Sequence, residues 1–383
     1  MSVTAAQGFR ASGVVAGLKQ SGRPDVAVVV NDGPSDVAAA VFTANRCKAN
    51  PVLWSERVIA DGRARAVVLN SGGANCYTGP QGFQNTHASA ELAAKLLDAA
   101  ASDIVVCSTG LIGEQLDGPK LLAGIQSSID TLSGTGGADA ATAIMTTDTV
   151  SKQAEHTGDG WTIGGMAKGA GMLAPALATM LVVVTTDAVI DAELADAALR
   201  EACRHTFDRL DSDGCMSTND TVLLMSSGAS GSAPDAPTFT AALTDVCHDL
   251  AQQLLGDAEG SEHDIAIDVV RAASEDDAVD VGRAIARSNL FKCAVYGNDP
   301  NWGRILAAVG TTAATFEPST VDVAMNGVWI CRDGGPGERR EDVDLKGRKV
   351  NVTVDLKAGA ASATIWTNDL THAYVHENSA YST

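Results

Sequence analysis

The apolar, β-branched run that opens at Thr179 constrains this 383-residue chain more than any other segment. Ala178 precedes the threonine, and a glycine-rich loop that carries Lys168 leads into it. The stretch 173–184 is too short to cross a membrane and contains Pro175, so the run predicts a strand.

Thr179 is also the candidate nucleophile. A threonine hydroxyl is a poor nucleophile unless a base stands beside it. One such base is the threonine's own α-amine, which exists only after the chain is cut before it. We interpret Ala178-Thr179 as a self-cleaving bond and Thr179 as the catalytic nucleophile afterwards. The alternative is an ordinary strand threonine, chosen for its β-propensity.

Strand-like and helical patterns alternate along the chain. Apolar residues recur at helical spacing over 194–210 and 239–254, which predicts two amphipathic helices. The expected class is α/β (α+β) with mixed sheets. We expect a layered αββα-type sandwich with a smaller C-terminal α/β domain, of the self-cleaving N-terminal-threonine type. Buried strands are predicted, among others, at 25–31, 38–43, 66–70, 104–107 and 222–225.

Length alone suggests about two domains. The Ser/Gly/Ala/Pro-rich loop 226–237 is the best linker candidate, so we expect an N-terminal α/β domain over 1–230, with the cleavage site inside it, and a C-terminal α/β domain over 238–383. Asn326-Gly327, between alternating segments, predicts a two-residue hairpin. Segments 350–356 and 361–366 predict a second hairpin.

Composition limits the partners. The net charge of −20 argues against nucleic acid and anionic membranes. The N-terminus lacks a basic-then-apolar signal pattern, and no apolar run reaches ~18 residues, so we expect a cytoplasmic protein with no membrane span. Eight scattered cysteines with no Cys-x-x-Cys pair predict free, mostly buried thiols rather than disulfides or a zinc site.

Two further segments carry candidate chemistry. Thr109-Gly110 directly follows an apolar strand, where backbone N–H groups can face a developing oxyanion; a common turn is the alternative. Lys168 either binds a carboxylate or is an exposed charge. The spacing Gly169-x-Gly171 also fits a loose dinucleotide fingerprint, but Pro175 and the strand-like run after it do not fit the βαβ unit that this fingerprint needs.

The C-terminal part holds weaker candidates. Glu259 follows a long predicted helix, where a carboxylate opposes the helix dipole; the alternative is a surface C-cap. His372 and His376 have the spacing of a helical metal pair but lack an evident third ligand, so we expect surface histidines and no metal. The polar-aromatic tail 377–383 is a candidate to fold back onto the protein.

These segments together resemble the bacterial ornithine acetyltransferase family, also called the bifunctional glutamate N-acetyltransferases of arginine biosynthesis. The resemblance runs along essentially the whole chain. It is carried by Ala40-Val-Phe-Thr43, Cys107-Ser-Thr-Gly-Leu-Ile-Gly113, Ala143-Ile-Met-Thr-Thr-Asp-Thr149, Lys168-Gly-Ala-Gly-Met172, Ala178-Thr-Met-Leu181, Ser217-Thr-Asn-Asp-Thr221, Asp257-Ala-Glu-Gly260, Asp299-Pro-Asn-Trp-Gly-Arg304 and Glu377-Asn-Ser-Ala-Tyr-Ser-Thr383.

The resemblance implies transfer of an acetyl group from N-acetylornithine to glutamate through acetyl-Thr179, with no cofactor; whether acetyl-CoA also serves as donor stays open. It implies an α chain of residues 1–178 and a β chain from 179, joined as α2β2. Thr109 and Gly110 match the family's oxyanion pair. The family's substrate-contacting positions fall on Thr146, Lys168, Thr179, Glu259, Asn378 and Thr383, with Glu259 also expected to assist catalysis.

The chain departs from the family where Gly260-Ser-Glu-His263 lacks a lysine that often follows the Glu-Gly pair. Two other functions remain as alternatives. One is an N-terminal-threonine amidohydrolase or aminopeptidase that passes the acyl group to water. The other is a non-catalytic or dinucleotide-binding α/β protein.

Overall fold

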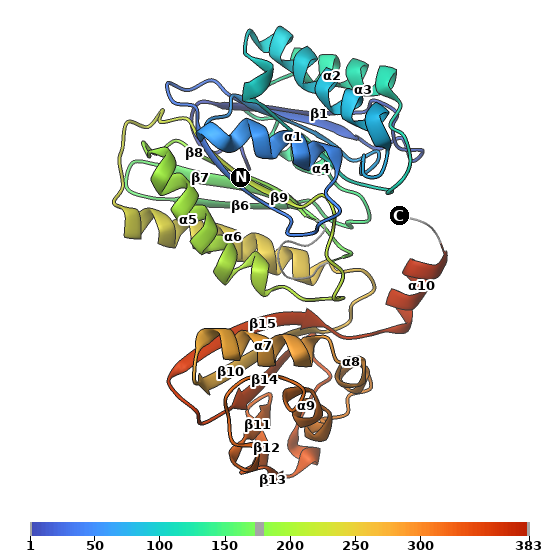
Figure 1. Cartoon of the computed structure of the whole chain (residues 1–383), viewed down its shortest axis with the longest axis vertical. Helices are drawn as coiled ribbons and strands as arrows, with labels where there is room; N and C mark the ends of the chain where they lie inside the picture. Colours follow the sequence, from blue (N-terminus) through green and yellow to red (C-terminus); the bar gives the residue numbers. More distant parts are fainter. Residues whose placement is uncertain (1, 173–179, 381–383) are drawn as a thin grey trace.

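Residues 2–172 and 180–380 are described by the computed structural model, so Ala178, Thr179 and Thr383 lie outside the described residues. Two sheets stack face to face, and a helical layer covers the outer face of each (Figure 1). A third sheet with its own helices follows in the C-terminal part. The predicted class, a layered αββα arrangement with mixed sheets, is confirmed.

Apart from its edge strand at residues 9–14, the first sheet is built from valine-rich strands that are buried on both faces. Because side chains alternate along a strand, Val26 and Val28 of β2 pack against helices, whereas Ala27 and Val29 face the second sheet. The helices on the outer face are α2 (Gly79–Leu97) and α3 (Gly118–Asp130). In sheet order the strands are β1 (Phe9–Val14), β2 (Val26–Asn31), β4 (Ala66–Asn70) and β5 (Ile104–Ser108).

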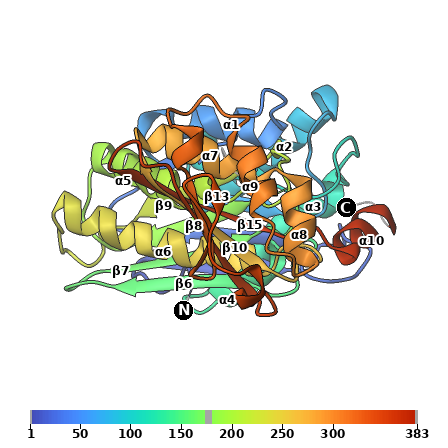
Figure 2. The same ribbon diagram turned by 90° about the horizontal axis from the view of Figure 1, so that it is seen from below.

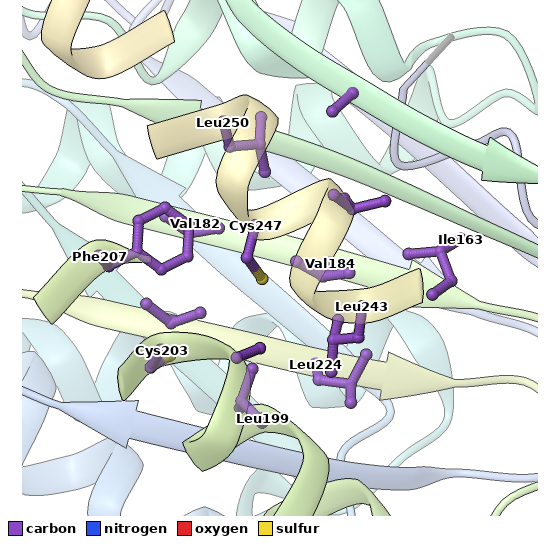
Figure 3. Close-up of a cluster of buried hydrophobic side chains, with 14 of the residues drawn as sticks. Ile163, Val182, Val184, Leu199, Cys203, Phe207, Leu224, Leu243, Cys247 and Leu250 are labelled. Carbon is purple, nitrogen blue, oxygen red and sulfur yellow. The ribbon is translucent and has the colours of Figure 1, made fainter. Parts of the chain in front are cut away.

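The second sheet continues the run after residue 179. Its outer face packs against α5 (Ala192–His205) and α6 (Ala236–Gly256), where Leu199 and Leu250 meet Val182 and Val184 (Figure 3). In sheet order the strands are β3 (Val37–Phe42), β9 (Thr221–Ser226), β8 (Leu181–Thr186), β7 (Thr162–Lys168) and β6 (Lys152–Thr157). Strands β7 and β8 are antiparallel neighbours, which excludes a βαβ dinucleotide fold at the glycine-rich loop.

Small side chains let the two sheets and the N-terminal segment approach closely. The layer between the sheets is rich in alanine and valine, with α4 (Gly137–Ala143) packed at its edge. At Gly164 of β7, a Cβ atom would lie 2.0 Å from the carbonyl oxygen of Ser2, so only glycine fits there. Helix α1 (Asn50–Val58) lies against β5 and is tied to it by Ser55 Oγ, which donates to the Val106 carbonyl at 2.8 Å.

The third sheet packs one face against α7 (Glu275–Ala286), α8 (Asn289–Tyr296) and α9 (Trp302–Val309) (Figure 2). In sheet order its strands are β13 (Gly335–Pro336), β12 (Val328–Arg332), β11 (Asp322–Met325), β14 (Lys349–Asp355), β10 (Asp264–Ala272) and β15 (Ala361–Asn368). The predicted hairpin at Asn326-Gly327 is confirmed, and both residues have the positive φ that such a turn needs.

The second predicted hairpin is wrong. Strands β14 and β15 both exist, but β10 lies between them, parallel to β14 and antiparallel to β15. The predicted helix over 194–210 is also too long: α5 ends at His205, and Phe207 lies in the following 3-10 turn, still fully buried. The short 3-10 helices span Ile59–Asp61, Ala101–Asp103, Phe207–Arg209, Pro318–Thr320 and Arg340–Asp342.

The loop 226–237 joins β9 to α6, and α6 packs against the second sheet rather than the third. The division into domains at 230 and 238 stays a prediction, and this packing places α6 with the residues before the loop. Helix α10 (His372–Ala380) closes the described chain (Figure 1). Among the described residues, no helix is both long and apolar enough to cross a membrane.

Candidate active site

Six of the predicted site residues line one small cavity of about 130 Å³. They come from the ends of β5 and β7, from the segment after α4, from the turn after α6 and from α10. The six are Thr109, Gly110, Thr146, Lys168, Glu259 and Asn378. The predicted cleavage residues Ala178 and Thr179 and the predicted contact Thr383 lie outside the described residues.

Lys168 is the last residue of β7, and its side chain is 1% exposed. Its Nζ donates to Thr146 Oγ1 at 2.7 Å and to Thr109 Oγ1 at 3.3 Å. Burial lowers the pKa of Lys168, and the nearby Asp148 carboxylate opposes that shift. The alternative of an exposed surface charge is therefore excluded. A buried ammonium flanked by two hydroxyls is suited to binding a carboxylate.

Thr109 and Gly110 stand where β5 ends. The Thr109 amide donates to the Asn70 carbonyl at 3.0 Å, so this N–H is already paired within the first sheet. The expectation that both backbone amides face an oxyanion is corrected for Thr109, whose side-chain hydroxyl oxygen accepts a hydrogen bond from Lys168 Nζ. Gly110 has φ +128° and would place a Cβ 2.9 Å from the Gly73 backbone, so its position requires glycine.

Glu259 faces the cavity from the turn after α6. The carboxylate accepts a hydrogen bond from Asn378 Nδ2 at 3.1 Å, which ties the turn to α10. Its backbone amide donates to the Ala170 carbonyl at 2.9 Å. A Cβ at Gly171 would lie 2.7 Å from Glu259 Oε2, so the glycine-rich loop leaves room for this carboxylate. The alternative of a surface C-cap is therefore not what the structure shows.

Sequence reasoning missed several residues of the cavity. Asp213, Cys215 and Tyr374 line it without having been predicted there. Burial is the main cause that raises the pKa of Tyr374, with the carboxylates of Asp213 and Glu259 adding to it. Asp148 lies directly behind the cavity and accepts a hydrogen bond from the Thr146 amide at 2.9 Å. Only the shared Thr-Thr-Asp-Thr segment signalled it, and residue type alone gave it no role.

Asp220 lies beside the first residue described after the gap. Its Oδ1 accepts a hydrogen bond from the Met180 amide at 3.0 Å. The side chain is fully buried, and within the described residues Oδ2 has no hydrogen-bond partner. Burial raises the pKa of Asp220 well above its usual range, whereas the Met180 amide and the charge of Lys168 act in the opposite direction.

Other chemistry proposed from the sequence is not assembled in the described residues. No group of three or more His, Cys, Asp or Glu there is arranged to hold a metal ion, and His372 and His376 are exposed on α10. All eight cysteines are free, and five are buried. Cavities of about 670 and 740 Å³ flank Trp366, between the third sheet and helices α5 and α6. They contain none of the predicted residues.

Comparison with known proteins agrees with the resemblance. The model of the ArgJ family matches residues 10–383. The chain belongs to the ArgJ family. It is 63% identical over 382 residues to the arginine biosynthesis bifunctional protein ArgJ of Streptomyces coelicolor, and 65% identical over 383 residues to that of Thermobifida fusca. Each alignment covers 100% of both chains. The predicted family is confirmed.

Two solved structures are also similar in sequence. One is ornithine acetyltransferase of Mycobacterium tuberculosis complexed with ornithine, at 54% identity and TM-score 0.45, covering 47% of this chain and 96% of that one. The other is ArgJ of Bacillus halodurans, at 36% identity and TM-score 0.49, covering 51% of this chain and 97% of that one.

Proposed function

We propose that this ArgJ family member transfers the acetyl group of N2-acetyl-L-ornithine to L-glutamate through an acetyl ester on Thr179, giving L-ornithine and N-acetyl-L-glutamate. The observation that carries the proposal is the buried Lys168, whose Nζ lies 2.7 Å from Thr146 Oγ1 in a cavity of about 130 Å³. A space of this size suits an amino-acid side chain and its carboxylate, and is below the ~300 Å³ typical of larger ligands.

Self-cleavage comes first in this proposal. Thr179 Oγ attacks the carbonyl carbon of Ala178, the acyl group moves from nitrogen to oxygen, and water then releases the α chain, residues 1–178. The freed α-amine has a reference pKa of about 7.7–8.0, close to the working pH of a general base. The β chain begins at 179, and we propose that the two chains stay together as α2β2 in the cytoplasm.

Acetyl transfer then follows in two halves. The α-amine takes the proton of Thr179 Oγ, and the oxygen attacks the acetyl carbonyl of N-acetylornithine. The Thr109 hydroxyl and the Gly110 amide donate to the oxyanion, and ornithine leaves as the proton returns to its amine. Glutamate enters the same site, and its amine attacks the ester, so that the acetyl group passes on and Thr179 is regenerated.

The charged residues of the cavity bind different groups of the substrates. Lys168 pairs with the α-carboxylate that both substrates share. Glu259 orients the reacting amine or carries its proton, with Asn378 holding that carboxylate in place. Thr146 and Thr383 are proposed as further substrate contacts, and the Thr146 hydroxyl also accepts a hydrogen bond from Lys168. No metal or other cofactor is needed for these steps. Acetyl-CoA is kept as a second acetyl donor to be tested.

The experiment is denaturing electrophoresis combined with an exchange assay. Wild-type protein is expected as two bands of nearly equal size, and Thr179→Ala as one full-length band without activity. Acetylornithine with excess glutamate is expected to yield N-acetylglutamate; acetate as the product at every glutamate concentration points instead to a hydrolase. Acetyl-CoA plus glutamate, without acetylornithine, tests the second donor. Full activity of an uncut wild-type chain contradicts the proposal.

A further inference from the structure

Asp148 sits behind the cavity, with its side chain fully enclosed. Its Oδ2 accepts a hydrogen bond from the Thr146 amide at 2.9 Å and lies 4.0 Å from Lys168 Nζ. Its Oδ1 accepts from the Gly169 amide at 2.6 Å. One carboxylate therefore holds the backbone of two segments whose side chains, Thr146 and Lys168, face the cavity.

The Asp148 carboxylate also forms an ion pair with a second lysine, Lys152. Lys152 Nζ lies 2.7 Å from Asp148 Oδ1 and 2.6 Å from Asp257 Oδ2, and the Lys152 side chain is fully buried. Asp257 also accepts a hydrogen bond from the Thr149 amide at 3.0 Å. Because Asp257 stands two residues before Glu259, this row of alternating charges connects the α6 end of the cavity with the Lys168 end.

Such a row is costly for stability alone. Buried ions lose their hydration, and well-packed apolar residues of the same volume are often as stabilising. A buried row of charges does, however, hold each of its side chains in one orientation. Asp148 is also the counter-ion of Lys168, which burial would otherwise favour in its neutral form. The other titratable groups that act on Lys168 are the carboxyl groups of Asp220 and Glu259 and the amines of Lys152 and Lys19.

We propose that Asp148 is the positioning residue of this site. It orients the Lys168 side chain, keeps that side chain charged, and orients Thr146. Through Lys152 and Asp257 it links both residues to the turn that carries Glu259. The inference rests on the proposed function, since Lys168 is taken to bind the substrate carboxylate. Asp148 itself touches no substrate; it acts through the lysine and the backbone around it.

The test variant is Asp148→Asn, which keeps the shape of the side chain and removes its charge. The KM for both acetylornithine and glutamate is expected to rise roughly tenfold or more, as for the loss of a charge-assisted interaction, with a smaller change in kcat. The high-pH limb of the kcat/KM profile is expected to move to lower pH, because Lys168 loses its proton more readily without the carboxylate.

Asp187→Asn is the matched control. Asp187 is also buried and also accepts two backbone hydrogen bonds, from Thr162 N at 2.7 Å and Gln7 N at 2.9 Å, at the opposite end of β8. It is expected to lower stability while leaving KM and the pH profile as in the wild type. An Asp148→Asn enzyme with wild-type KM and pH profile overturns the proposal and shows a purely structural carboxylate.

A second variant covers the case in which Asp148→Asn does not fold. Asp257→Asn leaves Asp148 beside Lys168 and breaks only the far end of the row. It is expected to raise KM about threefold to tenfold, as for one weakened hydrogen bond to a charged group. Unchanged KM in Asp257→Asn then overturns the proposal. A wild-type enzyme with no acetyl exchange at all would instead refute the proposed function, so the two failures can be told apart.

Discussion

The Met180 amide donates a hydrogen bond to Asp220 Oδ1 at 3.0 Å, and the side chain that accepts it is fully buried. Burial raises the pKa of this carboxyl well above its usual range. The folded protein therefore keeps a proton on Asp220 at pH values where the unfolded chain, with a reference pKa of about 3.9, has lost it.

The sign of the pH dependence follows from that difference. Because the folded state binds more protons, stability falls as pH rises from about 4 through the raised pKa of Asp220. In Asp220→Asn this loss of stability is expected to be absent, so that the free energy of unfolding depends less on pH. Urea unfolding at a series of pH values measures it, in the Thr179→Ala background so that one chain is present. Equal slopes with and without Asp220 contradict the prediction.

Lys168→Met is expected to lower kcat/KM for acetylornithine and glutamate about 10- to 100-fold, because a buried ammonium that binds a carboxylate is replaced by an apolar group. The measurement is steady-state kinetics of each substrate at saturating partner. Lys95→Met, on the exposed side of α2, is the control and is expected to match the wild type. Normal kinetics of Lys168→Met would remove the lysine from substrate binding.

Asn378→Ala removes the hydrogen bond to Glu259 that joins α10 to the turn after α6. KM is expected to rise about fivefold, the equivalent of one modest hydrogen bond, with self-cleavage intact. The neighbouring Ser379→Ala is the control, since among the described residues Ser379 Oγ bonds within α10, to the His376 carbonyl at 3.3 Å. If both variants behave alike, the tail has no specific part in binding.

Leu250→Ala probes the helical layer over the second sheet. Leu250 of α6 is fully buried in the cluster of Figure 3, and its truncation is expected to cost about 2–5 kcal/mol of unfolding free energy. Leu290→Ala, at a side chain that is 66% exposed, is expected to cost about 0.5 kcal/mol or less. Chemical denaturation of both in the Thr179→Ala background compares them, and equal losses would place α6 outside the core.

Local patterns predicted most of the elements. Valine-rich runs became β2, β4, β5 and β8. The hairpin at Asn326-Gly327 was predictable because its turn chemistry is local. The second hairpin was not, because β10, some 80 residues earlier in the chain, takes the place between β14 and β15.

The candidate site, like the fold, was predictable from the sequence only in part. The order of nine short segments along the chain, among them those that contain Thr109, Lys168 and Glu259, was enough to suggest the acetyltransferase family. The burial of Lys168, the pairing of the Thr109 amide and the contacts of Asp148 were not visible in the sequence. Each depends on segments that meet only after folding: Thr109 is 59 residues from Lys168, and Lys152 is 105 from Asp257.

By itself, then, the order of residues determined most of the strands, the helices with a clear apolar stripe and the family, because propensity and motif act over a few neighbours. Tertiary structure alone decided which strand lies between which, which charges are buried, and which carboxylate stands beside Lys168. The physical reason is that desolvation and ion pairing act through space, between groups that the chain brings together from distant positions.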